Sequence, residues 1–260
     1  MSSEELRNRL SSIIHETPFS DGVTYEYPGN LFKVFEWYRP RKVVKQPKKF
    51  KGKRVRTDQS NSDEAVQRAK GEIRNYILAN DFDIWVTCTF ATDRQNADLC
   101  LHKMHSWLKN WQKRHPKCKY LCVHEYHADD ASLHFHILLE GFTGKIIPAV
   151  NPKTGKPVRQ HGRQVYSIAS FQHGFSSVVK IDGTVESRRK LASYLGKYMS
   201  KDMPEFFNKK RYWHFKNLNH PSKTPGLPVW YGKVEPLWTK ELEFGRQSWF
   251  LLDGTEVRKG

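Results

Sequence analysis

Hydrophobic and polar residues alternate most clearly in the stretch SLHFHILLEG at 132–141. Every second position is apolar, as in a strand with one buried face: Leu133, Phe135, Ile137 and Leu139. The intervening His134 and His136 must then share the opposite face. The pattern therefore predicts a strand that presents two imidazoles on one side.

Other segments of the chain show equally regular patterns. Alternation predicts further strands at 84–90, 119–126 and 175–181. Helical spacing of apolar residues predicts helices at 62–81, from a TDRQ capping box at 92–95 to about His115, and at 185–204. The order strand, helix, strand, hairpin, strand favours an α+β fold, with a central antiparallel sheet of about five strands and flanking helices.

The charge of the chain narrows the choice of partners. The 260 residues include 44 Lys and Arg against 27 Asp and Glu, a formal net charge of +17. Such an excess attracts anions, with nucleic acid or an anionic membrane as the obvious partners. No apolar run approaches the length of a membrane span, and the N-terminus does not resemble a signal peptide. We therefore expect a cytoplasmic protein without a membrane partner.

Two classes of chemistry lack support in the sequence. The four cysteines match neither a zinc pattern nor a disulfide framework. No phosphate-binding loop of the ATPase type is present, so the chain shows no motor motif of its own.

A basic run at 39–56 contains ten Lys and Arg and no acidic residue. It is either a solvated arm or an arm that becomes ordered on DNA phosphates. On the second interpretation the DNA-binding residues include Arg39, Arg41, Lys42, Lys48, Lys49, Lys51, Lys53, Arg54 and Arg56. The predicted organisation is a basic, partly disordered extension at 1–61, a central domain at 62–205, and an aromatic, basic extension at 206–260.

The histidine pair indicates a metal site. Alternate strand residues lie roughly 6–7 Å apart, so both imidazoles can reach one ion. Glu125, near the end of the neighbouring strand, would supply a carboxylate, although it has the parity of Leu121 and Val123 and needs a bulge or the strand end to turn it. The competing third ligands are His124, His127 and Glu140. Alternatively, both histidines are polar residues on a solvent-facing side of the sheet.

The helix predicted at 185–204 carries a second chemical pattern. Tyr194 and Tyr198 lie four residues apart and share a helix face, and Lys197 and Lys201 each follow a tyrosine by three. An ammonium group stabilises a phenolate, and a divalent ion polarises a phosphate. Tyrosine, lysine and metal together indicate phosphoryl transfer to the protein. The alternative is two half-buried tyrosines with lysines covering the core edge.

Three motifs in order resemble those of the HUH endonucleases, which initiate rolling-circle replication. WVTCTF at 85–90 resembles the first motif, HFH at 134–136 the histidine pair, and YLGKYMSK at 194–201 the two-tyrosine motif of initiators of small single-stranded DNA phages and plasmids. HEYHADDASLHFH also resembles the arrangement in which a glutamate precedes the histidines. The resemblance covers about 84–203.

The resemblance implies an RRM- or ferredoxin-like nuclease domain that uses Mg²⁺ or Mn²⁺. One tyrosine would attack DNA at an origin, leaving a 5′-phosphotyrosine link and a free 3′-hydroxyl, and the other would rejoin the strand at termination. Thr87 and Thr89 would support strand geometry or contact DNA. The implied partners are single-stranded DNA with an origin hairpin, a host or accessory helicase and a DNA polymerase, in the cytoplasm of a bacterial host.

Two other functions remain open at this level. A transposase or conjugative relaxase of the same class would use the same chemistry. The position of the tyrosines after the histidines favours an initiator or a two-tyrosine transposase. A non-enzymatic RRM-like nucleic-acid-binding protein would also account for the charge and the aromatic content.

Overall fold

The computed structural model describes residues 22–38, 59–126, 132–151, 153–198, 212–243 and 245–253. The chain divides into two units. One comprises Asp58–His220; the other combines Met1–Thr57 with Pro221–Gly260. The basic residues predicted at 39–56, together with His127 and Lys201, lie outside the described residues.

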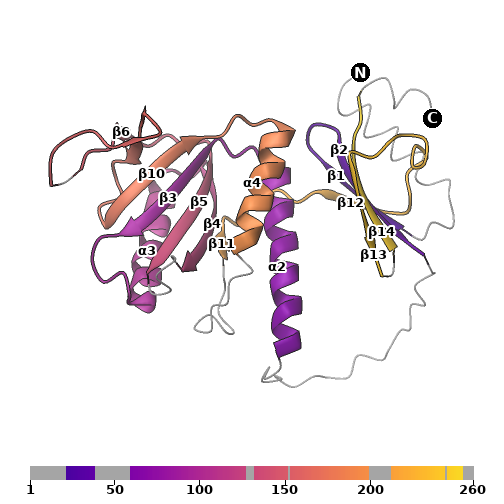
Figure 1. The fold of residues 1–260 in the computed structure, drawn as a ribbon, viewed down its shortest axis with the longest axis horizontal. Helices are drawn as coiled ribbons and strands as arrows, with labels where there is room; N and C mark the ends of the chain where they lie inside the picture. Colours follow the sequence, from indigo (N-terminus) through magenta and orange to yellow (C-terminus); the bar gives the residue numbers. More distant parts are fainter. Residues whose placement is uncertain are drawn as a thin grey trace. The chain divides into compact units, whose positions relative to one another are not determined.

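The Asp58–His220 unit is built on a seven-stranded antiparallel sheet in the order β11-β4-β5-β3-β10-β9-β6 (Figure 1). Its strands are β3 (Ile84–Phe90), β4 (Lys119–Tyr126), β5 (Leu133–Glu140), β6 (Ile146–Pro148), β9 (Tyr166–Ile168), β10 (Gly174–Lys180) and β11 (Tyr212–His214). A small hairpin pairs β7 (Arg159–Gln160) with β8 (Arg163–Gln164). The helices are α2 (Gln59–Ala79), α3 (Ala97–Arg114) and α4 (Val185–Tyr198).

Helices cover both faces of this sheet. Met104 and Trp111 of α3 pack with Phe135 of β5 in one core cluster. On the other face, Ile77 of α2 and Leu195 of α4 pack in a second cluster with strand residues of β4 and β5. Figure 1 shows α2 and α4 side by side, across the sheet from α3. The predicted α+β class is therefore confirmed, with seven strands in place of about five.

The start of α3 differs from the prediction. Its N-cap is Asn96, whose Oδ1 accepts a hydrogen bond from the backbone N–H of Leu99 at 3.1 Å. Asp93 has a left-handed φ of 55°, and its carbonyl accepts a hydrogen bond from the N–H of Asn96. Residues 93–96 therefore form a turn, and the predicted capping box at 92–95 is wrong.

The other unit is a five-stranded antiparallel sheet in the order β12-β1-β2-β14-β13. It joins β1 (Gly22–Tyr27) and β2 (Leu31–Trp37) to β12 (Ser222–Pro225), β13 (Trp238–Leu242) and β14 (Gly245–Leu251). Segments that the sequence assigned to two separate extensions thus pair as neighbouring strands, since β1 lies against β12 and β2 against β14.

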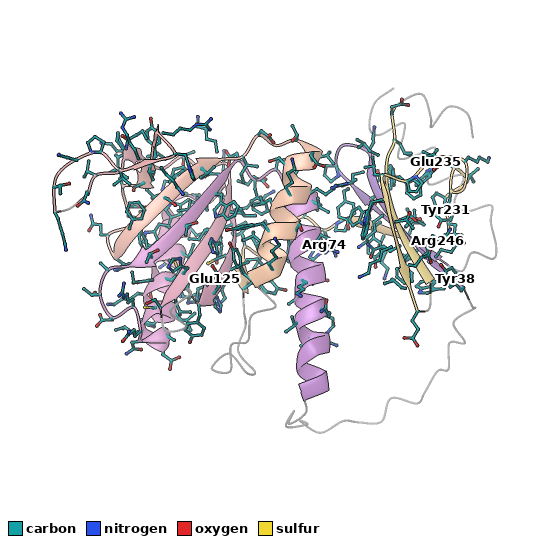
Figure 2. The ribbon with its side chains drawn as sticks, in the orientation of Figure 1. Tyr38, Arg74, Glu125, Tyr231, Glu235 and Arg246 are labelled. Carbon is teal, nitrogen blue, oxygen red and sulfur yellow. The ribbon has the colours of Figure 1, made fainter. Side chains whose placement is uncertain are left out.

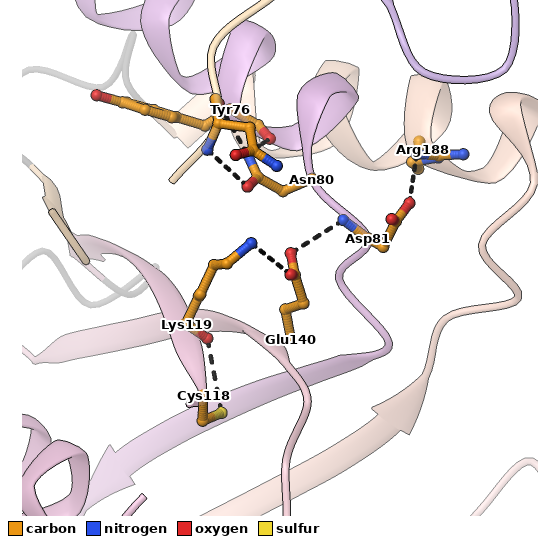
Figure 3. A network of polar contacts seen from close by, with 8 residues as sticks. Tyr76, Asn80, Asp81, Cys118, Lys119, Glu140 and Arg188 are labelled. Atoms are coloured by element: carbon orange, nitrogen blue, oxygen red, sulfur yellow. Dashed lines mark hydrogen bonds and ion pairs between the residues drawn. The ribbon is translucent and has the colours of Figure 1, made fainter. Parts of the chain in front are cut away.

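A polar network connects α2, α4 and the sheet (Figure 3). Glu140 accepts hydrogen bonds from Lys119 Nζ at 2.6 Å and from the backbone N–H of Asp81 at 3.1 Å. Arg188 Nη1 donates to Asp81 Oδ1 at 3.0 Å. Arg188 lies in the first turns of α4, so the network anchors the helix at the end opposite to Tyr198.

None of the helices in the described ranges has both the length and the apolar character of a membrane span.

Candidate active site

The histidine strand β5 turns its two kinds of residue to opposite faces, as alternation predicts. Leu133, Phe135, Ile137 and Leu139 are fully buried in the cluster that contains α3. His134 and His136 therefore face α2 and α4. His136 is only 4% exposed, so the alternative of a solvent-facing pair is wrong for this residue.

The strand register brings Glu125 to the histidines without a bulge. Glu125 of β4 lies directly opposite His134 of β5, and opposed residues of antiparallel strands project to the same side. The register is continuous along both strands, so the expectation that a bulge or strand end must turn Glu125 is wrong. Leu121 and Val123 share its parity because they too face the helices, in the core cluster formed by α2 and α4.

His136 is held on both ring nitrogens. Its Nε2 lies 3.1 Å from Glu125 Oε1, and its Nδ1 lies 3.3 Å from Thr87 Oγ1. With Glu125 ionised, Nε2–H donates to the carboxylate and the Thr87 hydroxyl donates to Nδ1. Thr87 is opposite His136 across the β3–β5 pair, and Thr89 is opposite His134. Both threonines thus lie on the histidine face, and Figure 2 labels Glu125 on this sheet.

The competing third ligands do not lie with the pair. His124 is fully buried among the aromatic rings of the α3 side, 5.3 Å from the Trp213 ring and 6.0 Å from the Phe135 ring. Glu140 lies at the far end of β5, opposite Lys119, and belongs to the network of Figure 3. Of the four candidates, Glu125 is the one that contacts a histidine of the pair among the described residues.

The helix α4 brings both tyrosines to this face. The Tyr198 ring stacks on the His136 ring, with centroids 4.6 Å apart and planes 7° apart. Tyr194 meets Tyr198 edge-on at 4.8 Å and the Trp85 ring at 5.0 Å. Trp85 in turn meets His136 at 5.8 Å. These four residues, His136, Tyr198, Tyr194 and Trp85, form one ring cluster beside Glu125.

The two phenols have different surroundings. Tyr194 is 42% exposed, whereas Tyr198 is partly buried beneath it. Burial raises the pKa of Tyr198, and a hydrogen bond with Tyr194 and the negative charge of Glu125 raise it further. Tyr198 therefore stays protonated at neutral pH, and a cation near Glu125 would oppose the carboxylate's contribution to this shift.

Sequence reasoning assigned no role in the site to Trp85. Its signal was its parity with Thr87 and Thr89, which places it on the histidine face of β3. Lys197 is exposed on α4, one residue before Tyr198.

The donor set can be compared with the needs of a divalent cation. One carboxylate and two imidazoles on one sheet face suit a transition ion such as Mn²⁺, and the carboxylate suits Mg²⁺. Within the described part of the chain, however, no three His, Cys, Asp or Glu side chains are grouped closely enough to hold a metal. Glu125 instead bonds directly to His136, which brings an oxygen and a nitrogen donor together at one point.

An antiparallel sheet with a buried histidine, a carboxylate and two tyrosines on one face defines an α+β protein equipped for acid–base or nucleophilic chemistry. Residues 83–203 match a family of replication-associated proteins, the ORF2 family. This match contains β3, β5 and α4, and it supports a role for the chain as a replication initiator. No curated protein sequence and no solved structure matches the chain.

Proposed function

We propose that this chain is a replication initiator that nicks single-stranded DNA at an origin through a tyrosine nucleophile. The observation that carries the proposal is the contact between Tyr198 and His136, because it brings a phenol from a distant helix to the carboxylate–histidine pair. The similarity to replication-associated proteins supports the same function.

The reaction exchanges one phosphodiester bond for another. The phenol oxygen of Tyr194 or Tyr198 attacks the scissile phosphorus, and a bond between tyrosine and the 5′ side of the DNA forms as the bond to O3′ breaks. The phenol proton is transferred, in net terms, to the departing 3′-hydroxyl. The reverse reaction, with an incoming 3′-hydroxyl, rejoins the strand and releases the tyrosine. Two tyrosines on one helix face allow cutting and rejoining without loss of the DNA.

Glu125, His134 and His136 are the residues we assign to a bound Mg²⁺ or Mn²⁺. Such an ion would polarise the scissile phosphate and so make a neutral phenol a sufficient nucleophile. Thr87 orients the His136 ring through Nδ1, a role that side chains behind a ligand commonly have. Lys197 and Lys201 are assigned to stabilising the charge on the phenol oxygen during transfer.

DNA contacts outside the site rest on charge. The basic run at 39–56 is proposed to bind backbone phosphates, and Thr89 lies beside His134 where a strand entering the site would pass. A helicase and a DNA polymerase would be supplied by the host or by accessory proteins.

The decisive experiment incubates the full chain with single-stranded origin DNA and Mn²⁺ and separates the products on an SDS gel. We expect an SDS-resistant protein–DNA adduct that vanishes when Tyr194 and Tyr198 are both replaced by Phe. Tyr166→Phe, at an exposed tyrosine of β9, is the matched control and should leave the adduct unchanged. Adduct formation by the double variant would refute the assignment of the nucleophiles.

The same assay separates the alternatives. A transposase or relaxase of the same chemistry would form the adduct on transposon-end or transfer-origin DNA and not on a replication origin. A non-enzymatic binding protein would retain DNA without forming any adduct.

A further inference from the structure

The five-stranded sheet formed by the two ends of the chain has two different faces. Phe32, Val34 and Phe250 project to one face, where Trp230 and Leu252 complete a hydrophobic cluster. Because side chains alternate, the neighbouring residues of the same strands project to the other face. We call it the Lys33 face.

One row of residues crosses the whole Lys33 face, with one residue from each strand. Tyr25 lies opposite both Lys223 and Lys33, Lys33 lies opposite Trp249, and Trp249 lies opposite Trp238. The row therefore reads Lys223, Tyr25, Lys33, Trp249, Trp238, and spans about 19 Å at the usual strand spacing. The adjacent rows of the same face add three more aromatic residues: Tyr27, Phe35 and Trp37.

The charges of this sheet separate by face. The acidic residues of its strands, Glu26, Glu36 and Glu241, all have the parity of the covered face. There Glu36 accepts a hydrogen bond from Tyr231 at 2.9 Å, and Glu241 binds Arg246 at 2.7 Å. Figure 2 shows Tyr231 and Arg246 together on this sheet. The Lys33 face carries lysines without acidic residues from these strands.

The aromatic residues of the Lys33 face are arranged in a supported layer. Trp249 is buried and stacks on Tyr27 at 5.6 Å, and Lys33 Nζ lies 3.9 Å from the centroid of the Tyr25 ring. Above this layer, Trp238 is 47% exposed and Lys223 is exposed, at opposite ends of the row. Tyr25, Phe35 and Trp37 are partly exposed between them.

We propose that the Lys33 face is a binding site for single-stranded DNA, separate from the histidine–tyrosine site. Aromatic rings on a sheet face with lysines beside them are the elements that single strands bind, because unpaired bases stack on rings while phosphates contact ammonium groups. Bases within a duplex are stacked on one another and do not offer their faces to such a surface. The charge separation across the sheet favours a polyanion over an apolar protein partner.

This proposal does not depend on nicking, so its test excludes catalysis. Binding of the full chain to a labelled oligo-dT of about 15 nucleotides is measured by fluorescence anisotropy in EDTA, over a range of salt concentrations. We expect Trp238→Ala to weaken binding about 5- to 100-fold, as loss of one stacked base predicts. Lys223→Ala should lower the slope of log affinity against log salt by about 0.7.

Matched controls come from the covered side of the same sheet. Lys233→Ala removes an equal charge from the loop that carries Trp230, and Tyr38→Leu removes an exposed aromatic ring that bonds Glu241. Both controls should bind like the wild type. If Trp238→Ala lowers the melting temperature, Lys240→Ala, at an exposed lysine of the same face, replaces it as the affinity test.

The proposal is overturned if Trp238→Ala, Lys223→Ala and Lys240→Ala bind oligo-dT as the controls do. It is also overturned if they weaken binding to duplex DNA as strongly as to the single strand, or if oligo-U is bound more tightly than oligo-dT. Failure of the nicking proposal looks different, because adducts would be absent while these variants still lost affinity.

Discussion

The imidazole of His136 and the phenol of Tyr198 lie parallel, 4.6 Å apart between centroids and 7° apart in plane. The first belongs to a central strand and the second to the last described turn of α4, sixty-two positions later in the chain. Their contact exists because the core cluster containing Leu195 and Leu138 holds α4 against the sheet. Several expectations depend on this contact and its neighbours.

Glu125→Gln is expected to abolish metal-dependent adduct formation and leave the fold intact. The amide retains the size of the carboxylate and can accept from His136 Nε2, but it lacks the charge that a cation requires. Adduct assays with Mn²⁺, together with calorimetric Mn²⁺ titration, measure the effect.

The control for that variant is Glu140→Gln, at the other end of β4 and β5. It breaks the ion pair with Lys119 and should cost about 1 kcal/mol of stability without loss of adducts. Full activity of Glu125→Gln would remove Glu125 from the proposed ligand set.

Thr87→Val tests the second contact of His136. Valine has nearly the same shape but cannot bond Nδ1, so the ring loses the partner that orients it. We expect a loss of roughly 10- to 100-fold in metal affinity or in the rate of adduct formation. Thr87→Ser retains the hydroxyl and should restore most of the rate; equal losses in both variants would mean that packing of the methyl group matters and not the hydrogen bond.

The pKa of Tyr198 predicts a pH dependence of stability. Burial, the hydrogen bond with Tyr194 and the charge of Glu125 raise this pKa above its ordinary value of about 10. Above about pH 10 the unfolded chain therefore loses a proton that the folded chain keeps, and the free energy of unfolding falls as pH rises. Tyr198→Phe should lose less stability than the wild type between about pH 9 and about pH 11 in urea unfolding.

Tyr166→Phe changes an exposed tyrosine and should follow the wild-type pH dependence. If Tyr198→Phe declines as steeply as this control, Tyr198 does not titrate differently in the folded and unfolded states.

Leu195→Ala tests how α4 is held over the histidines. Leu195 is completely buried in the cluster between α2, α4 and the sheet. We expect a loss of about 2–5 kcal/mol in the free energy of unfolding, measured with urea, because a cavity remains where the side chain packed. Ser193→Ala, at an exposed position of the same helix, should change stability by less than about 0.5 kcal/mol.

Local sequence patterns determined which residues form strands and which face each side chain takes. Alternation separated Leu133 and Phe135 from His134 and His136, and the structure has the same separation because successive strand residues must point to opposite sides. The predicted bounds of β4 agree with the structure, and the core residues of α3 follow the predicted helical period. The turn at Asp93 was not predicted because several nearby residues can cap a helix.

Pairing between distant segments was decided only by the tertiary structure. Nothing in the local pattern states that Glu125 is opposite His134, since register depends on hydrogen bonds between strands and on the core that both strands share. The sheet that unites 22–37 with 222–251 is a stronger example, because its central strands come from opposite ends of the chain. Alternation defines the faces of each strand, whereas only packing of the whole chain decides which faces meet.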